Sequence, residues 1–206
     1  MDKLRGNYSK PATKHGIRLL HILTDFVFDG TKNTPNTVSD QTNPINVYGA
    51  SKLAGEQAIK AYCPVNSAIV RTSWVYSSHG NNFVKTMLRL MAEKDQLSVV
   101  SDQIGCPTNA EGLANYLWFL SELSTLESIY HYSGQGVASW YDFAIAIQEI
   151  AIEAGKLKRE ILIEAVPSSE YLTPAKRPTF SLLKQSHNKL QWRESLKLYK
   201  PFVRNS

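Results

Sequence analysis

The chain has 206 residues, of which 43% are hydrophobic and 20% charged, a composition typical of a globular domain with a sizeable core. No apolar run approaches the roughly 18 residues that a membrane-spanning helix needs, and segment 1–16 lacks the apolar stretch of a secretory signal. We therefore expect a cytoplasmic protein with no membrane partner. The two cysteines, Cys63 and Cys106, are interpreted as free thiols; the alternatives are a disulfide and a catalytic cysteine.

The net charge of +5 raises the question of a nucleic-acid partner. A nucleic-acid-binding protein usually shows a basic stripe with stacking aromatic residues, or a known module. The sequence shows neither, so we predict no nucleic-acid partner. The basic region near the C-terminus is interpreted as a solvated face, the alternative being a site for an anionic small molecule such as a sugar diphosphate. Its members are Lys184, Lys189, Arg193, Lys197, Lys200 and Arg204.

Strands and helices alternate along the chain. Short apolar runs predict the strands, and apolar residues that recur every three or four positions predict the helices. Asn109 and Ser139 are predicted N-caps of two helices. This alternation favours an α/β fold with a parallel sheet that is covered on both faces. The predicted strands are 17–25, 66–76, 97–102, 128–134 and 160–167, the helices are 47–63, 81–94, 109–123 and 139–155, and a polar loop fills 26–46.

Three residues near the first predicted strand suggest carbonyl chemistry. Tyr48 and Lys52 lie four positions apart at the start of a predicted helix, so their side chains project from one face. A nearby ammonium favours the phenolate form of a tyrosine, and such a pair acts as a general acid or base in ketone–alcohol interconversion. Thr24, at the carboxyl end of strand 17–25, can hydrogen-bond the reacting oxygen. The alternative is a chance helical pair.

Six motifs, in order, resemble the dTDP-4-dehydrorhamnose reductase family of extended short-chain dehydrogenases over roughly residues 16 to 192. They are LTDFVFDG (23–30), NVYGASKLAGE (46–56), RTSWVYSSHGNNFVKTMLRL (71–90), DQIGCPTNAEGLA (102–114), GQGVASWYDFA (134–144) and PAKRPTFSLL (174–183). The resemblance implies Thr24, Tyr48 and Lys52 as the catalytic triad, with Tyr48 and Lys52 also holding the cofactor.

The same resemblance implies residues that bind the sugar nucleotide. These are Trp74 and Arg177, with Asp25, Asn82 and the Gln103–Thr108 loop as further candidates. Three of these residues have a structural alternative: Trp74 as core, Arg177 as a surface cation, and Asn82 as the cap of its helix. The five histidines, at 15, 21, 79, 131 and 187, have no metal-ligand spacing, and no metal ligand is assigned.

The sequence departs from the family pattern in three ways. Leu23 replaces a serine and Phe26 replaces a tyrosine, and neither change touches the triad. The third departure concerns the glycine-rich loop that binds a dinucleotide: no glycines in the sequence have its spacing after a predicted strand. Gly134-Gln-Gly136 comes closest but lacks the third glycine. Segment 7–16, with Pro11 and almost no apolar face, is interpreted as a degraded helix.

We therefore expect the second half of a Rossmann-like doubly wound parallel sheet, interleaved with a smaller α/β substrate subdomain. Residues 1–15 would be poorly defined, 16–135 would form the remaining dinucleotide-binding domain, and 136–206 mainly the sugar-nucleotide subdomain. Strand 17–25 would then be an exposed edge that invites self-association. The chain alone is expected to be inactive and not to bind NADPH.

The resemblance implies reduction of the 4-keto group of dTDP-4-dehydro-6-deoxy-L-mannose to dTDP-L-rhamnose, with NADPH or NADH as cofactor, in cell-surface polysaccharide biosynthesis. It also implies a homodimer and Mg²⁺, for which the sequence reveals no ligands. Two alternatives belong to other classes. One is a non-catalytic subunit similar to the regulatory subunit of methionine adenosyltransferase, which the intact triad disfavours. The other is a decayed gene fragment.

Overall fold

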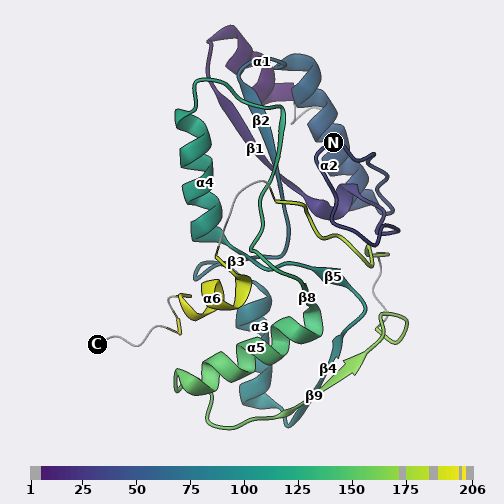
Figure 1. Ribbon diagram of the computed structural model, residues 1–206, viewed down its shortest axis with the longest axis vertical. Helices are drawn as coiled ribbons and strands as arrows, with labels where there is room; N and C mark the ends of the chain where they lie inside the picture. The colour runs from purple at the N-terminus through teal and green to yellow at the C-terminus, as the bar shows by residue number, and fades with distance from the viewer. Residues whose placement is uncertain (1–5, 172–174, 186–189, 200, 203–206) are drawn as a thin grey trace.

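The computed structural model describes residues 6–171, 175–185, 190–199, 201 and 202, and Figure 1 shows two packed regions. The helices are α1 (Gly6–Lys14), α2 (Val47–Tyr62), α3 (Phe83–Glu93), α4 (Ala110–Glu122), α5 (Trp140–Glu153) and α6 (Trp192–Lys197), with a 3-10 helix η2 (Asp25–Val27). The strands are β1 (Leu19–Thr24), β2 (Ser67–Thr72), β3 (Val75–Tyr76), β4 (Gln96–Val100), β5 (Ile104–Gly105), β6 (Thr108–Asn109), β7 (Ile129–His131), β8 (Ala138–Ser139) and β9 (Leu162–Val166). Within the described residues, no helix is long and apolar enough to cross a bilayer.

The first region is built on a three-stranded parallel sheet. Its strand order is β1-β2-β7, and the register pairs Thr24 with Thr72. All six residues of the central strand β2 are buried, whereas β1 pairs only with β2 among the described residues and leaves Ile22 44% exposed. The predicted parallel sheet is confirmed, with β1 at its edge.

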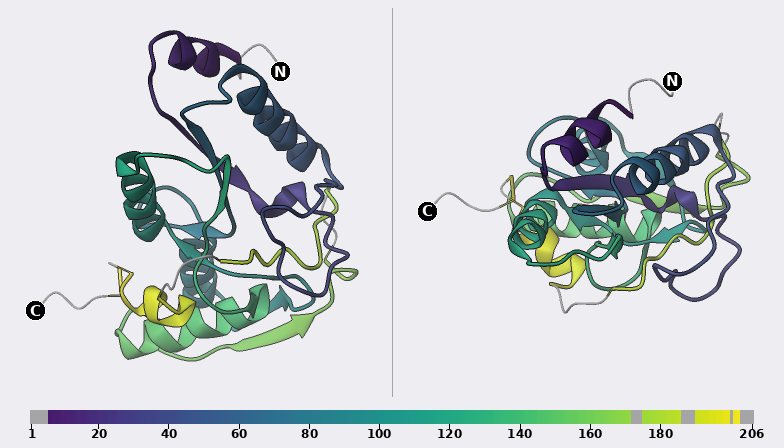
Figure 2. Two further views of the ribbon diagram at one scale, coloured as in Figure 1. Left: turned by 45° about the horizontal axis from the view of Figure 1, so that its top comes forward. Right: turned by 90° about the horizontal axis from the view of Figure 1, so that it is seen from above.

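Helices cover both faces of this sheet, as predicted. Successive strand residues point to opposite faces, so Val70 packs with Leu113, Tyr116 and Leu120 of α4. Its neighbour Ile69 packs on the other face, with Leu23 and with Ile59 of α2. Figures 1 and 2 show α2 and α4 on opposite sides of the strands.

The second region holds the largest hydrophobic core. Helices α3 and α5 pack on each other and on the parallel pair of β4 and β9, and α6 closes the core. Phe143 and Ile147 of α5 are fully buried there. Because α3 and β4 precede α4 and β7 in the chain, the two regions are interleaved in sequence.

The predicted helix caps are present. Asn109 accepts a hydrogen bond from the backbone N–H of Glu111, and Ser139 forms a capping box with Asp142. Gly155 follows α5 at φ +70°, the left-handed conformation that ends many helices. These local signals explain why the predicted bounds of α4 and α5 agree with the structure.

Residues 6–14 of the N-terminal segment form the short helix α1, which contains Pro11. Proline removes one intrahelical hydrogen bond, and so short a helix is marginal by itself. Contacts with α2 stabilise it: Ser9 and Ala12 are buried, and the Thr13 hydroxyl donates to the carbonyl of Tyr62 at 2.8 Å. Tertiary packing therefore offsets a weak local sequence.

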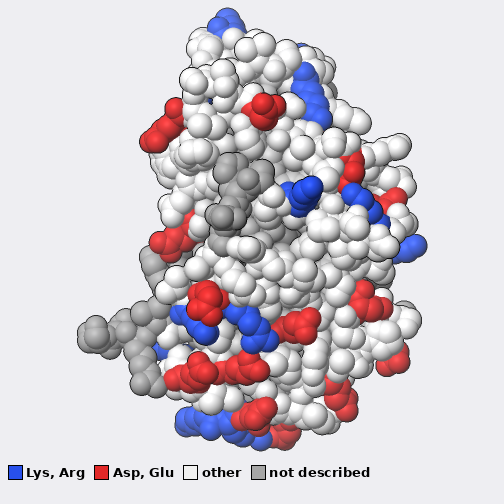
Figure 3. All heavy atoms as spheres, viewed as in Figure 1, with Lys and Arg blue, Asp and Glu red and all other residues white. Residues whose placement is uncertain are grey.

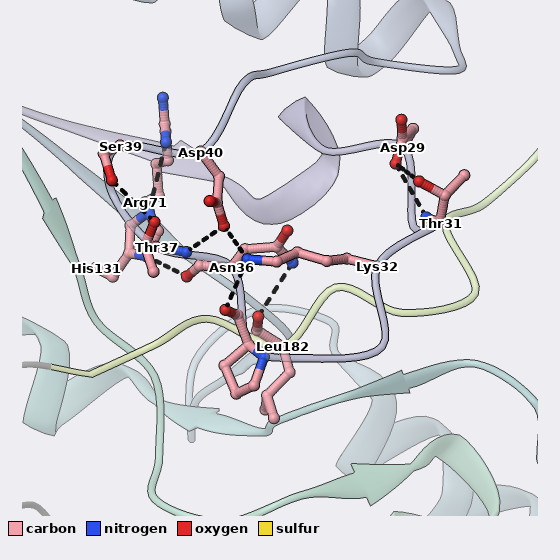
Figure 4. A network of polar contacts seen from close by, with 11 residues as sticks. Asp29, Thr31, Lys32, Asn36, Thr37, Ser39, Asp40, Arg71, His131 and Leu182 are labelled. Atoms are coloured by element: carbon pink, nitrogen blue, oxygen red, sulfur yellow. Dashed lines mark hydrogen bonds and ion pairs between the residues drawn. The ribbon is translucent and has the colours of Figure 1, made fainter.

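A buried polar network ties the sheet to the loop after η2 (Figure 4). Arg71 of β2 donates two hydrogen bonds to Glu56 of α2, at 2.7 and 3.1 Å, and both side chains are 2% exposed. His131 of β7 lies 3.4 Å from Arg71 through Nε2 and 3.1 Å from the carbonyl oxygen of Asn36 through Nδ1. The amide of Asn36 donates onward to the carbonyl of Leu182 at 3.1 Å.

We expect His131 to make the protein less stable as the pH falls from about 6.5 to about 4. Burial, then the charge of Arg71, lower the pKa of His131 from 6.5 to about 4. Between those values the unfolded chain binds a proton that the folded chain does not, so acid favours unfolding, by about 2 kcal/mol near pH 4.5. Urea unfolding near pH 7 and pH 4.5 should show a larger drop for wild type than for His131→Gln. Equal drops would exclude His131 as the cause.

Candidate active site

A pocket of about 370 Å³ lies at the carboxyl ends of β1 and β2, where parallel sheets bind their ligands. Thr24 ends β1 and Thr72 ends β2, side by side in register. The hydroxyl oxygen of Thr72 is buried, with no hydrogen-bond partner among the described residues. The pocket is lined by Ile22, Leu23, Thr24, Asp25, Phe26, Tyr48, Lys52, Thr72, Ser73, Trp74, Val75 and Trp140.

The first turns of α2 place Tyr48 and Lys52 at this pocket. Asn46 caps the helix by accepting the backbone N–H of Gly49 at 2.7 Å. A Cβ at Gly49 would lie 2.2 Å from the carbonyl oxygen of Phe26, so only glycine lets α2 approach η2 this closely. The approach brings the rings of Tyr48 and Phe26 edge to face, with 5.8 Å between their centroids.

The ammonium of Lys52 lies 5.5 Å from the centroid of the Tyr48 ring, and Tyr48 itself is half exposed. The predicted Tyr48–Lys52 juxtaposition is therefore present in the structure. Together with Thr24 across the pocket, it places a phenol, an ammonium and a hydroxyl around one cavity. Such a set can donate a proton to a carbonyl oxygen and stabilise the charge that develops there.

Two tryptophans form one wall of this pocket. Trp74 has φ +46°, a conformation that is strained for a bulky residue, and its ring stacks on Trp140 at 3.8 Å with 12° between the planes. A Cβ at Gly105 would lie 2.8 Å from the Trp74 ring, so the loop beneath it needs glycine. Trp140 is a site residue that was not predicted from the sequence. The one local signal for Trp140 is its position directly after the predicted Ser139 cap, which makes it the first residue of a helix.

A second pocket, of about 210 Å³, lies on the other side of Trp140. Trp140 lines both pockets, and Arg177 and Gln103 line the second one only. Its remaining wall is largely apolar, so it can accept a flat ring beside a cation. The other lining residues are Phe83, Met87, Ser98, Val99, Val100 and Tyr171.

Asn82 and most of the Gln103–Thr108 loop lie away from both pockets. Asn82 lines neither pocket; it caps α3 through the N–H of Lys85 at 3.2 Å and donates to the carbonyl of Ser77 at 2.6 Å. The structure thus shows the capping alternative for Asn82. Within the Gln103–Thr108 loop, Cys106 and Thr108 are fully buried, and Gln103 is the member that reaches a pocket.

Residues 175–184, which we call the C-terminal strap, connect the two pockets to the loop after η2. Asn46 donates to the carbonyl of Lys176 at 2.8 Å, and Thr179 donates to the carbonyl of Gly30 at 3.0 Å. Further along, the backbone N–H of Asn36 donates to the carbonyl of Leu182 at 2.7 Å. The strap thereby carries Arg177 to the second pocket and Ser181 to Asp25.

The cysteines agree with the sequence interpretation, whereas Lys189, Lys200 and Arg204 of the basic region lie outside the described residues. Figure 3 shows Lys and Arg interspersed with Asp and Glu on the displayed face, without a continuous basic stripe. Cys63 and Cys106 are both buried free thiols. Burial raises the pKa of Cys106 to about 12, which makes this thiol unreactive at neutral pH.

Comparison with known proteins identifies the family. A family model for the RmlD substrate binding domain matches residues 5–205. The dTDP-4-dehydrorhamnose reductase of Sinorhizobium fredii is 44% identical over a 174-residue match that covers 82% of this chain and 58% of that protein. The chain thus spans about 60% of the length of the curated relatives it matches.

Solved structures lead to the same family. A dTDP-4-dehydrorhamnose reductase from Clostridium acetobutylicum has a TM-score of 0.88 and 36% identity, and the match covers 96% of this chain and 70% of that one. The Bacillus anthracis enzyme, solved in complex with NADP, has a TM-score of 0.88 and 34% identity over 97% of this chain and 70% of that one. The predicted Rossmann-like α/β fold is confirmed, and the chain belongs to the RmlD substrate-binding domain family.

Proposed function

We propose that this chain provides the catalytic and sugar-nucleotide-binding residues for reduction of the 4-keto group of dTDP-4-dehydro-6-deoxy-L-mannose to dTDP-L-rhamnose. The observation that carries this proposal is the single pocket shared by Thr24, Tyr48 and Lys52 in a chain of this family. A reduced nicotinamide, from NADPH or NADH, would supply the hydride for C4 of the sugar. The residues of the pocket suit this cofactor, because a half-exposed phenol and an ammonium offer hydrogen bonds to a ribose.

Each member of the triad has a separate task. Tyr48 donates its proton to the ketone oxygen as the carbonyl carbon is reduced. The ammonium of Lys52, 5.5 Å from the ring, stabilises the negative charge that remains on the phenol oxygen. Thr24 donates a hydrogen bond to the same ketone oxygen and so fixes the orientation of the sugar.

The second pocket would hold the nucleotide end of the substrate. Arg177 supplies a cation for the diphosphate, and the apolar wall beside it suits the thymine ring. Trp140 lines both pockets and stacks on Trp74, so in this proposal the sugar would lie against the tryptophan stack. In this proposal residues from both predicted segments hold the nucleotide end: Phe83, Met87 and Gln103 come from 16–135, and Trp140 and Arg177 come from 136–206. Asp25 remains a predicted member of the substrate site, whose pocket it lines, whereas Asn82 is assigned to the cap of α3.

We further infer that the reaction takes place in the cytoplasm and that the protein works as a homodimer. The two free thiols agree with a reducing compartment. Within the described part of the chain, no three metal-ligating side chains come together, so we assign no Mg²⁺ site to these residues.

The function can be tested with a completed enzyme. The chain would be fused to the part of the Sinorhizobium fredii reductase that its match leaves uncovered. Oxidation of NADPH should then require the 4-keto sugar nucleotide, and dTDP-L-rhamnose should appear in equal amount. If the fusion binds both ligands but forms no rhamnose, the proposed reaction is wrong.

Arg177 provides a separate test of the substrate side. Arg177→Ala in this fusion should raise KM for the sugar nucleotide about tenfold or more and change kcat much less, because a diphosphate contact binds substrate and transition state alike. The neighbouring Lys176→Ala is the matched control, since Lys176 is an exposed cation that lines neither pocket. An unchanged KM in Arg177→Ala would make Arg177 a surface cation.

A further inference from the structure

The hydroxyl of Thr24 already has two hydrogen-bond partners in the structure. It accepts the backbone N–H of Phe26 at 3.2 Å and donates its proton to Oδ1 of Asp25 at 3.0 Å. A hydroxyl has one proton to donate and two lone pairs that accept. While this proton points at Asp25, Thr24 cannot donate to a carbonyl oxygen in the pocket.

Asp25 is an unusual partner for Thr24, because its carboxyl group is buried. The residue is 2% exposed, and Oδ2 has no hydrogen-bond partner in the described part of the chain. Burial raises the pKa of Asp25 to about 6, although hydrogen bonds from Ser181 and Thr24 act in the opposite direction. The protonated carboxyl group is therefore accessible near neutral pH.

Burial, rather than a neighbouring charge, has the largest effect on the carboxyl group of Asp25. Helix α2 contributes Tyr48 and Lys52 to the same pocket. In strand β2, the charge of Arg71 is paired with Glu56. The strap presents the uncharged Ser181 to the carboxyl group.

We propose that Asp25 is a positioning residue: in its protonated form it donates to Oγ1 of Thr24 and turns the Thr24 proton toward the ketone oxygen of the substrate. Thr24 then accepts from Phe26 and from Asp25 and donates to the substrate, which uses its full hydrogen-bonding capacity. Asp25 keeps its proton throughout, and Tyr48 remains the source of the proton on the product. This role rests on the proposed function.

The assignment predicts a pH effect with a definite sign. As the pH rises through the pKa of Asp25, the carboxylate again accepts a hydrogen bond from the Thr24 hydroxyl. The ketone oxygen then loses Thr24 as its hydrogen-bond donor. The value of kcat should therefore fall with rising pH, whereas KM should change little. Asp25→Asn retains an N–H donor at every pH, so in that variant this fall in kcat should disappear.

The decisive measurement is a pH titration of Asp25, which does not require the enzyme to turn over substrate. The carboxyl carbon of Asp25 would be followed by ¹³C NMR in the chain itself, with Asp25→Asn assigning the signal. We expect a midpoint near pH 6, as burial indicates. Because the Thr24 hydroxyl stabilises the carboxylate, Thr24→Val should raise this midpoint by about half a unit or more, whereas Thr24→Ser should leave it in place.

Two NMR outcomes would overturn the assignment. One is a wild-type midpoint in the ordinary aspartate range, near about 4. The other is the same midpoint in Thr24→Val and wild type. In the fusion enzyme, a uniform loss of kcat at all pH values in Asp25→Asn would show that Asp25 is only structural. Because the NMR titration is independent of catalysis, failure of the proposed reaction and failure of the Asp25 assignment are distinguishable.

Discussion

Glu56→Ala should lower the free energy of unfolding by about 3–5 kcal/mol, because it leaves the buried guanidinium of Arg71 without its counter-charge. The pair is bidentate, with both side chains 2% exposed. Burial alone would raise the pKa of Glu56, but hydrogen bonds and charge from Arg71 hold it below its usual value. The folded state therefore depends on the ionised pair.

The chain offers a matched control for this substitution. Glu93 forms an ion pair with Arg89 at 3.0 Å on the surface of α3, where both side chains are more than half exposed. Glu93→Ala should cost about 0.5 kcal/mol or less, because water screens such a pair. Urea unfolding of both variants measures the difference. Equal costs for Glu56→Ala and Glu93→Ala would mean that burial adds nothing to the Glu56–Arg71 pair.

The same pair bears on the active site. Glu56 lies one helical turn after Lys52 on α2, and Arg71 lies in the central strand of the sheet. Their two hydrogen bonds anchor the helix that carries Tyr48 and Lys52 to the strand that ends at Thr72. A variant that keeps its fold but loses this anchor should therefore also show lower kcat in the fusion enzyme.

The elements with strong local signals could be predicted from the sequence. Strand β1 follows from a short apolar run, and α4 and α5 follow from Asn109 and Ser139, whose caps need only three neighbouring residues. The local sequence of helix α1 is weak, and its stability comes from contacts with α2, which a local pattern does not contain.

In the candidate site too, residues with local sequence signals could be predicted and residues placed by long-range contacts could not. The Tyr48–Lys52 pair is local to one helix and could be predicted, as could the position of Thr24 at the end of a strand. Trp140 and Ser181 reach the site from later segments, and their roles depend on how the chain returns to the sheet. The buried position of Arg71 could not be predicted either, because its partners Glu56 and His131 lie 15 and 60 residues away in the sequence.

Tyr48→Phe should lower kcat of the fusion enzyme about 10²-fold or more, because it removes the proton donor of the proposed reduction and leaves the ring in place. Binding of the sugar nucleotide should change much less. The edge-to-face contact with Phe26 needs only the ring, so the variant should fold normally. Stopped-flow measurement of NADPH oxidation at saturating substrate gives the rate directly.

Tyr62→Phe is the matched control, since Tyr62 lies at the other end of α2. It is 47% exposed, against 50% for Tyr48, and it also lies near a lysine, with the ammonium of Lys10 4.7 Å from its ring centroid. Tyr62 lines neither of the two site pockets, so its substitution should leave kcat within about twofold of wild type. Turnover of Tyr48→Phe near that of Tyr62→Phe would remove Tyr48 from the mechanism. If kcat falls in Tyr48→Phe but not in Tyr62→Phe, the loss comes from the phenol in the pocket and not from removing any tyrosine hydroxyl on this helix.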